Sequence, residues 1–172
     1  MIRLHRLVCY INSSLDLHLK GHVGDSLDQL QLSLYSDADF AGDKSTSKST
    51  TGIFLALTGP NTFFPLNGVS KKQTCVSHSI PEAEVVAANA AVRFEGLLAL
   101  QLWDTILGRP VQATLLEDSQ ATMQILKSGK NPALRHVSRT HRVHLAWTSD
   151  VFRTCSQMGI STVVPLNKRP IS

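Results

Sequence analysis

Apolar and polar residues alternate along three stretches in the first half of the chain, as is typical of β-strands. These stretches are residues 31–37, 51–57 and 63–69, and a Gly-Pro-Asn turn between the last two predicts a hairpin. Pro65 cannot donate a backbone hydrogen bond, so it favours an edge position for the third strand. Residues 41–50 are almost entirely polar and predict a loop.

The hydrophobic spacing changes to a helical period after residue 79 and keeps it to Leu107. Ser79 and Glu82 have the spacing of a capping box, so we expect the Glu82 carboxylate to bond back to the helix cap. Glu84 is then free. It shares the core-facing stripe with small residues that let a helix lie close to a sheet, and the predicted stripe is Ala87, Ala88, Ala91 and Leu98.

The second half of the chain alternates between strand and helix patterns. Crossovers through helices imply that the later strands run parallel to the first, which predicts an α/β fold. Residues 1–30 form a lead-in that begins with helical spacing. The remaining predicted elements are strands over residues 111–117 and 160–164 and helices over residues 119–128 and 143–158, with Trp147 and Phe152 packing inward.

Acidic residues recur where these elements end or begin. Asp37 and Asp118 each fall at the carboxyl end of a predicted parallel strand, where ligands of such sheets gather. A carboxylate on the core-facing side of a helix, such as Glu84, is costly unless it is paired. We therefore expect Asp37, Glu84 and Asp118 to converge on divalent metal. Asp39 and Asp43 are interpreted as acids that order a loop, and Glu117 as a solvated neighbour on the opposite face.

Charge is distributed unevenly along the 172 residues, although the net charge is only +4. Residues 1–118 carry twelve acidic against nine basic residues, whereas residues 119–172 carry one acid, Asp150, against eight basic residues. An acidic cluster beside a basic half suits a metal site next to a track that binds nucleic-acid phosphates. The candidate phosphate-binding residues are Lys71, Lys72, Lys127, Lys130, Arg135, Arg139 and Arg142, and a solvated surface is the alternative for them.

Three histidines, His136, His141 and His144, lie among these basic residues. Their spacing, with no cysteine nearby, argues against zinc, and we expect at most an accessory role in proton transfer or product release. Three scattered cysteines are interpreted as reduced thiols of an intracellular protein. No apolar run reaches the roughly 18 residues of a membrane span, so no span is expected.

Six short motifs occur in an order that resembles a known family. Over residues 31–165, the chain resembles the ribonuclease H domain of copia-type retrotransposon polyproteins, and residues 4–11 are similar to the segment that joins reverse transcriptase to that domain. The motifs are Tyr35-Ser-Asp-Ala-Asp-Phe-Ala-Gly-Asp43, Ser49-Thr-Thr-Gly52, Ser70-Lys-Lys-Gln73, Pro81-Glu-Ala-Glu84, Glu117-Asp-Ser-Gln-Ala121 and Arg139-Thr-His141.

The resemblance implies a ribonuclease H-like mixed five-stranded sheet over residues 31–172, with three antiparallel strands, then parallel strands, and helices on both faces. It also implies an endonuclease that cleaves the RNA strand of RNA–DNA hybrids with two Mg²⁺ ions, for which Mn²⁺ can substitute. Asp37, Glu84 and Asp118 match the family's catalytic, metal-binding acids. The implied partners are the hybrid and the reverse transcriptase of a parent polyprotein, in the cytoplasm or nucleus.

The chain departs from the family pattern at its C-terminal end. The family has a fourth acid after the last strand, whereas here no acid follows Asp150 and the chain ends at Asn167-Lys-Arg-Pro-Ile-Ser172. His144 likewise replaces a family Asp. Two alternatives to an active ribonuclease H therefore stay open. One is a hybrid-binding or structural domain that has lost catalysis, and the other is a related two-metal nuclease or strand-transfer enzyme.

Overall fold

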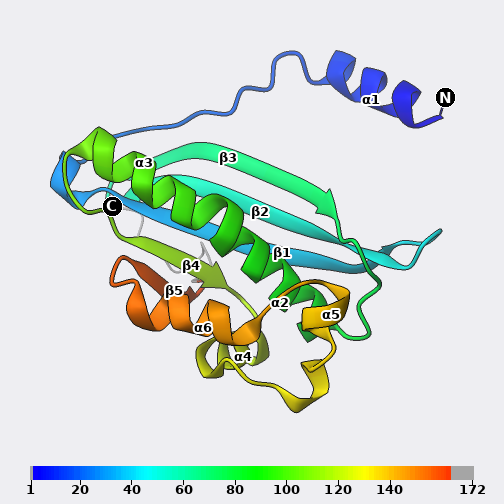
Figure 1. Ribbon diagram of the computed structural model, residues 1–172. Helices are drawn as coiled ribbons and strands as arrows, with labels where there is room; N and C mark the ends of the chain where they lie inside the picture. The colour runs from blue at the N-terminus through cyan, green and yellow to red at the C-terminus, as the bar shows by residue number, and fades with distance from the viewer. Residues whose placement is uncertain (1, 164–172) are drawn as a thin grey trace.

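One mixed β-sheet forms the framework of the molecule (Figure 1). A computed structural model describes residues 2–163. The strand order is β3-β2-β1-β4-β5, with β1, β2 and β3 antiparallel and with β4 and β5 parallel to β1. This arrangement confirms the predicted mixed five-stranded α/β sheet. The strands are β1 (Gln31–Asp43), β2 (Lys48–Gly59), β3 (Thr62–Lys72), β4 (Ala113–Glu117) and β5 (Met158–Thr162).

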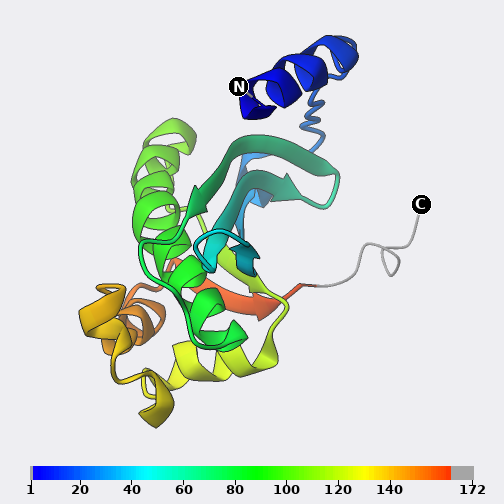
Figure 2. The same ribbon diagram turned by 90° about the vertical axis from the view of Figure 1, so that its right-hand side faces the viewer.

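A long helical rod lies across the sheet, and smaller helices pack beside β4 and β5 (Figures 1 and 2). The rod is α2 (Ile80–Ala90), the π-helical turn η2 (Ala91–Gly96) and α3 (Leu97–Leu107). Helix α1 (Ile2–Ser13) lies away from the sheet at the end of an extended stretch. The shorter helices are η1 (Leu27–Gln29), α4 (Gln120–Ser128), η3 (Pro132–Leu134), α5 (Val137–Thr140) and α6 (Leu145–Thr154).

The predicted loop over residues 41–50 is mostly strand, which corrects the sequence interpretation. Asp43 pairs with Lys48, so only residues 44–47 form the turn. The Asp43 carboxylate accepts hydrogen bonds from Ser45 and Thr46 and pairs with Lys72, and these contacts hold its pKa well below the usual range. Polar side chains therefore stabilise a tight hairpin here instead of a long loop. The predicted loop-ordering role of Asp43 is confirmed.

Strand β3 lies at the edge of the sheet, as Pro65 predicted. The register with β2 shifts at this point, because Leu55 pairs with Asn67 and the next residue, Ala56, pairs with Pro65. Leu66 is therefore an extra residue, and the chain forms a β-bulge where proline cannot donate.

The π-helical turn η2 changes which side of the rod faces the sheet. Ala87, Ala88 and Ala91 are fully buried, as expected, and so is Ala83. Leu98, which the uninterrupted helical spacing placed on the same stripe, is 62% exposed. The π turn adds a residue to the helical repeat, so the positions after it are rotated. Buried contacts pass instead to Gly96, Ala99 and Leu100.

The main core lies between the rod and the sheet. Leu32, Leu34 and Leu115 are fully buried there, together with Ala88 and Val92. By length and composition alone, the 28-residue rod is apolar enough to cross a membrane, but half of its most apolar stretch is buried in the protein. Such burial is what the core helix of a folded domain shows.

The elements of the second half form close to where the sequence places them. Helix α4 begins after Ser119, whose hydroxyl accepts from the Thr122 amide, and ends at Gly129 with a left-handed φ of 66°. Helix α6 begins after His144 and ends before Cys155, so it is shorter than the helix predicted over residues 143–158. Phe152 packs against the core as expected, but Trp147 is 38% exposed, which corrects its inward placement.

Candidate active site

Two of the predicted acids lie on neighbouring parallel strands. Tyr35 of β1 is in register with Leu116 of β4, so Asp37 and Asp118 each follow two residues later on adjacent strands. Both side chains are exposed. Parallel pairing therefore places the two carboxylates beside each other where β4 ends. Strand β1 itself continues six residues further to Asp43, so the predicted strand-end position of Asp37 is wrong.

The third predicted acid, Glu84, approaches the same position from helix α2. A small cluster of Ala38, Ala83 and Ala87 lets the helix lie directly on β1. Glu84 is only 6% exposed, and the Ala38 backbone N–H donates a hydrogen bond to its carboxylate. Its Oε2 atom is buried without a hydrogen-bond partner. An orphaned carboxylate oxygen of this kind is rare in folded proteins.

The electrostatics show that these acids are close together. Burial, together with the negative charges of Glu117, Asp37 and Asp118, raises the pKa of Glu84 to about 8. Carboxylates that share a site repel one another, so each makes the next harder to ionise. The structure thus gathers Asp37, Glu84 and Asp118 around one site and adds a fourth acid to them.

That fourth acid, Glu117, was expected to be solvated, and this interpretation is wrong. Glu117 is fully buried at the end of β4, and burial raises its pKa to about 7. Its Oε2 accepts from Ser36 Oγ at 2.9 Å and its Oε1 accepts from the Ser119 amide at 3.3 Å. Burial alternates along β4, and Glu117 lies on the same buried face as Ala113 and Leu115, so the sequence interpretation assigned it to the wrong face.

The donor set at this site suits a hard divalent cation. Three carboxylates supply the oxygen ligands that Mg²⁺ and Mn²⁺ prefer, and the unpartnered Oε2 of Glu84 has no protein donor to satisfy it. Within residues 2–163, no three His, Cys, Asp or Glu side chains are arranged so that they could hold an ion as they stand. The chemistry of the residues therefore fits a cation, with side-chain movement needed to complete its coordination.

Two of the three predicted accessory histidines contact another buried acid instead of the site. Glu82 is 1% exposed, and its Oε1 lies 3.1 Å from His136 Nε2 and 3.2 Å from His141 Nε2. Its Oε2 accepts from the backbone N–H of His78, one residue before the Ser79 cap. Burial lowers the pKa of His141, and the Glu82 charge opposes that shift. His144 is exposed just before α6 and has neither contact.

Capping spacing thus identified only part of what Glu82 does. The Ser79 hydroxyl does accept from the Glu82 amide, as a helix cap should. The contacts of Glu82 with His136 and His141 span more than fifty residues of sequence, and local patterns carry no signal for them.

The predicted phosphate-binding residues fall into two groups around cavities. Lys71 and Lys72 at the end of β3 and Arg142 line a groove of about 420 Å³ with Arg93 and Phe94 of η2. We call this the basic groove. Sequence analysis missed Arg93, which lies on the same rod as the acids. The Arg93 guanidinium stacks 5.1 Å from the Phe94 ring centroid.

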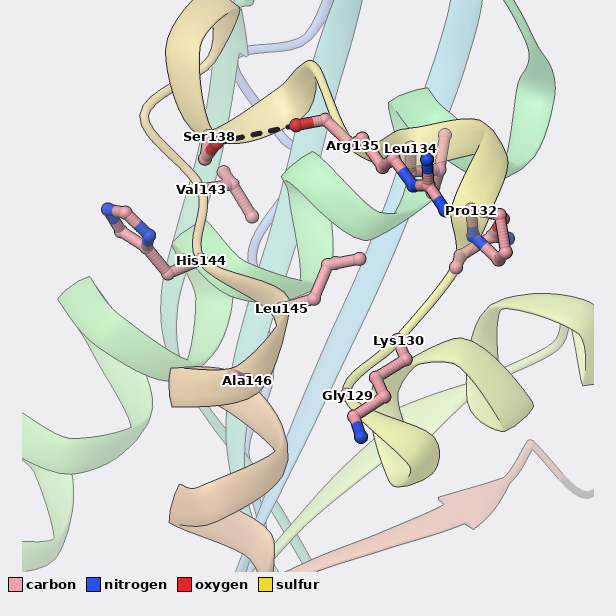
Figure 3. Close-up of a pocket in the computed structure, with 11 residues that line it drawn as sticks. Gly129, Lys130, Pro132, Leu134, Arg135, Ser138, Val143, His144, Leu145 and Ala146 are labelled. Atoms are coloured by element: carbon pink, nitrogen blue, oxygen red, sulfur yellow. Dashed lines mark hydrogen bonds between the residues drawn. The ribbon is translucent and has the colours of Figure 1, made fainter.

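A second cavity, also of about 420 Å³, lies between η3, α5 and the start of α6 (Figure 3). Lys130, Arg135 and His144 line it. Lys127 in the last turn of α4 and Arg139 in α5 are exposed outside both cavities. The basic residues are therefore spread over one broad surface and not gathered in a single pocket.

Comparison with known proteins identifies the fold. No protein-family model matches the chain, and no curated protein matches it in sequence. The solution structure of the PFV RNase H domain is 17% identical with a TM-score of 0.51, and the match covers 84% of this chain and 85% of that one. LC11-RNase H1, isolated from compost, is 16% identical with a TM-score of 0.47 over 78% of this chain and 85% of its own. The chain has a ribonuclease H-like fold.

Proposed function

We propose that the protein is a metal-dependent endonuclease that cleaves the RNA strand of RNA–DNA hybrids. The observation that carries this proposal is the orphaned Glu84 carboxylate, buried where the charges of Asp37 and Asp118 also act on it. The ribonuclease H-like fold supports it, because the PFV RNase H domain shares that fold. The basic groove beside the same helix supplies cationic side chains for a nucleic-acid backbone.

In this proposal Asp37, Glu84 and Asp118 hold the cations, and Glu117 does not. Two Mg²⁺ or Mn²⁺ ions bound there would supply an activated water and stabilise the leaving oxygen of an in-line displacement. Both oxygens of Glu117 already accept hydrogen bonds, so it has less capacity to serve as a ligand. Its role is to hold Ser36 and Ser119 in place beneath the exposed acids.

Binding of the hybrid is assigned to the basic residues. Each phosphate that a lysine or arginine neutralises releases counterions, so affinity should fall steeply with salt. Lys71 and Arg142 face one groove, which fits a continuous backbone track. The other proposed contacts are Lys72, Lys127, Lys130, Arg135 and Arg139.

The proposed biological setting is a copia-type retroelement polyprotein, in which the domain works beside reverse transcriptase inside the cell. The sequence motifs of residues 31–165 and the lead-in over residues 1–30 are the support for this setting. The division of the chain at residue 30 belongs to the same proposal.

A hybrid-binding domain without catalysis is the second candidate, and one observation favours it. The single acid after Asp118 is Asp150, which lies on α6 and pairs with Arg153. The one acid that follows Asp118 in the given sequence is therefore already paired on another element.

A cleavage assay separates the two candidates. A hybrid labelled on its RNA strand is incubated with the protein in Mg²⁺ and in Mn²⁺, with Asp37→Asn as the matched variant. RNA cleavage that is lost in Asp37→Asn supports the nuclease. Binding without cleavage in either metal supports the second candidate, and recovery of cleavage on appending an acid-bearing C-terminal helix would trace the loss to the missing acid. Cleavage of plain duplex DNA would instead indicate a different two-metal nuclease.

A further inference from the structure

The buried carboxylate of Glu82 joins helix α2 to a distant part of the chain. Its Oε1 contacts His136 at 3.1 Å and His141 at 3.2 Å, while its Oε2 accepts from the His78 amide at 2.9 Å. Both oxygens are therefore engaged, and the side chain is 1% exposed. A buried carboxylate in this state is satisfied within the protein, which distinguishes it from Glu84 two residues later.

The two histidines bracket one short helix. His136 is the residue before α5 (Val137–Thr140) and His141 is the residue after it. Residues 136–142 are called here the α5 segment. A single helical turn has almost no stability of its own, because nucleation of a helix is unfavourable. Further anchors are the fully buried Val137 and a hydrogen bond from Cys75 Sγ to the Thr140 carbonyl.

The α5 segment carries two of the exposed arginines. Arg139 lies within α5, and Arg142 follows it in a left-handed conformation with φ of 57°. Non-glycine residues avoid this conformation unless neighbouring contacts hold it. Arg142 and His141 form one wall of the basic groove, opposite Lys71 of β3.

We propose that Glu82 is a positioning residue that anchors the α5 segment, and thereby sets Arg139 and Arg142 against the phosphate backbone of the bound hybrid. Glu82 touches neither the acidic site nor the groove surface. It acts through His136 and His141, whose imidazoles transmit its position to the arginines. The proposal rests on the proposed function for its substrate, but the anchor is a property of the protein alone.

Hydrogen exchange of the free full-length protein tests the anchor without nucleic acid. The Glu82→Gln substitution replaces one carboxylate oxygen, beside two imidazoles, by an N–H₂ group. In this variant we expect the backbone amides of residues 137–143 to exchange about tenfold faster or more, because the segment opens more often. Asp104→Asn is the matched control on the same rod, because Asp104 accepts from the Val111 amide instead. Unchanged exchange in Glu82→Gln would overturn the proposal. If that variant does not fold, His136→Gln replaces it, since the His136 side chain is already 38% exposed.

Hybrid binding then tests the consequence for the arginines. In an Asp37→Asn background and in EDTA, fluorescence anisotropy should show that Glu82→Gln weakens hybrid binding about tenfold and lowers the salt slope by about one or two. Arg139→Ala and Arg142→Ala should each weaken hybrid binding in the protein that keeps Glu82. In the Glu82→Gln variant, the same substitutions should weaken binding little further. Additive effects would overturn the positioning role, because uncoupled residues add.

The two experiments separate failure of the anchor from failure of the proposed function. If the protein with Glu82 binds no hybrid at any salt concentration, the proposed function fails, while the exchange result still decides the anchor. If hybrid binding is strong and the Glu82→Gln substitution does not change the affinity, the positioning role fails and the proposed function stands.

Discussion

Two glutamates lie two residues apart at the start of the same helix, and their surroundings in the structure differ. Glu82 and Glu84 are both buried, at 1% and 6% exposure. Glu82 has a partner for each oxygen, namely two histidines and a backbone amide. Glu84 keeps one oxygen without any hydrogen-bond partner and feels the charges of Asp37, Glu117 and Asp118.

This difference distinguishes a structural acid from a candidate ligand. A satisfied buried carboxylate stabilises the fold, since removing it strands its partners. An unsatisfied carboxylate among like charges destabilises the fold, and such destabilising groups are typical of functional sites. The exposed fractions of Glu82 and Glu84 do not distinguish the two residues, whereas their hydrogen-bond partners do.

The largest expected effect concerns cleavage. Glu84→Gln should lower the rate of RNA cleavage by at least about 100-fold, because a neutral amide is a poor ligand for a divalent cation. The measurement is single-turnover cleavage of a labelled hybrid in Mg²⁺. Asp104→Asn, which changes an acid elsewhere on the rod that accepts from the Val111 amide, should cleave at the unsubstituted rate. Wild-type cleavage by Glu84→Gln would remove this residue from the site.

Stability should change in opposite directions in the two glutamate variants. In EDTA at pH 8, Glu84→Gln should raise the free energy of unfolding by roughly 1–2 kcal/mol, since like-charge repulsion is removed. Glu82→Gln should lower it by roughly 1–3 kcal/mol, because a buried carboxylate that bonds to His136 is replaced by an amide whose N–H₂ group is left without an acceptor. Urea unfolding measures both. A shift of the same sign in the two variants would contradict the distinction drawn between them.

The pH dependence of stability should also come from the acidic site. A carboxyl group whose pKa is higher in the folded protein binds more protons when folded, so it stabilises the fold at low pH. That contribution is lost as pH rises from 4.5, the ordinary pKa of a glutamate, through about 8, the pKa of Glu84 in the folded protein. Without metal, we expect the free energy of unfolding to fall by roughly 2–4 kcal/mol between pH 5 and pH 8.5.

Urea titrations at several pH values check this trend, with Glu84→Gln as the comparison. The variant should show a clearly shallower decrease, and the remaining slope should reflect Glu117, whose pKa is raised to about 7. An equal slope in both proteins would mean that other groups control the pH dependence.

The smallest expected effect is stabilisation by the cation. At pH 8, Mg²⁺ at ten times its dissociation constant should add about 1.4 kcal/mol to the stability, or about 3 °C in melting temperature. The increase should be absent in Glu84→Gln and present in Glu82→Gln. Differential scanning fluorimetry with and without Mg²⁺ measures it. An equal increase in all three proteins would place the cation elsewhere.

Much of the fold was predictable from local patterns. Alternation identified β1, β2 and β3, Pro65 marked the edge strand, and Ser79 and Gly108 bounded the long rod. The crossovers through helices predicted that β4 and β5 run parallel to β1, and the structure confirms this. These features depend on residues that are neighbours in sequence, so they can be predicted without knowing the tertiary structure.

Features that depend on packing were missed or reversed. The π-helical turn rotates Leu98 outward, and no residue within the turn gives a sequence signal that predicts the turn. Glu117 is buried because β1 supplies Ser36 beside it, a contact across 81 residues. Sequence spacing singled out Glu84 as the free acid of the pair, but its orphaned oxygen is visible only once α2 lies on β1.

The order of strands, the ends of helices and the placement of Asp118 at a strand end were therefore present in the sequence. Which acids are satisfied depends on contacts between residues far apart in the chain, such as Glu82 with His136 and His141. Secondary structure follows from periodicity and capping within a few residues. The partners of a buried charge depend on which elements pack together, and only the tertiary packing of the helices on the sheet determines this.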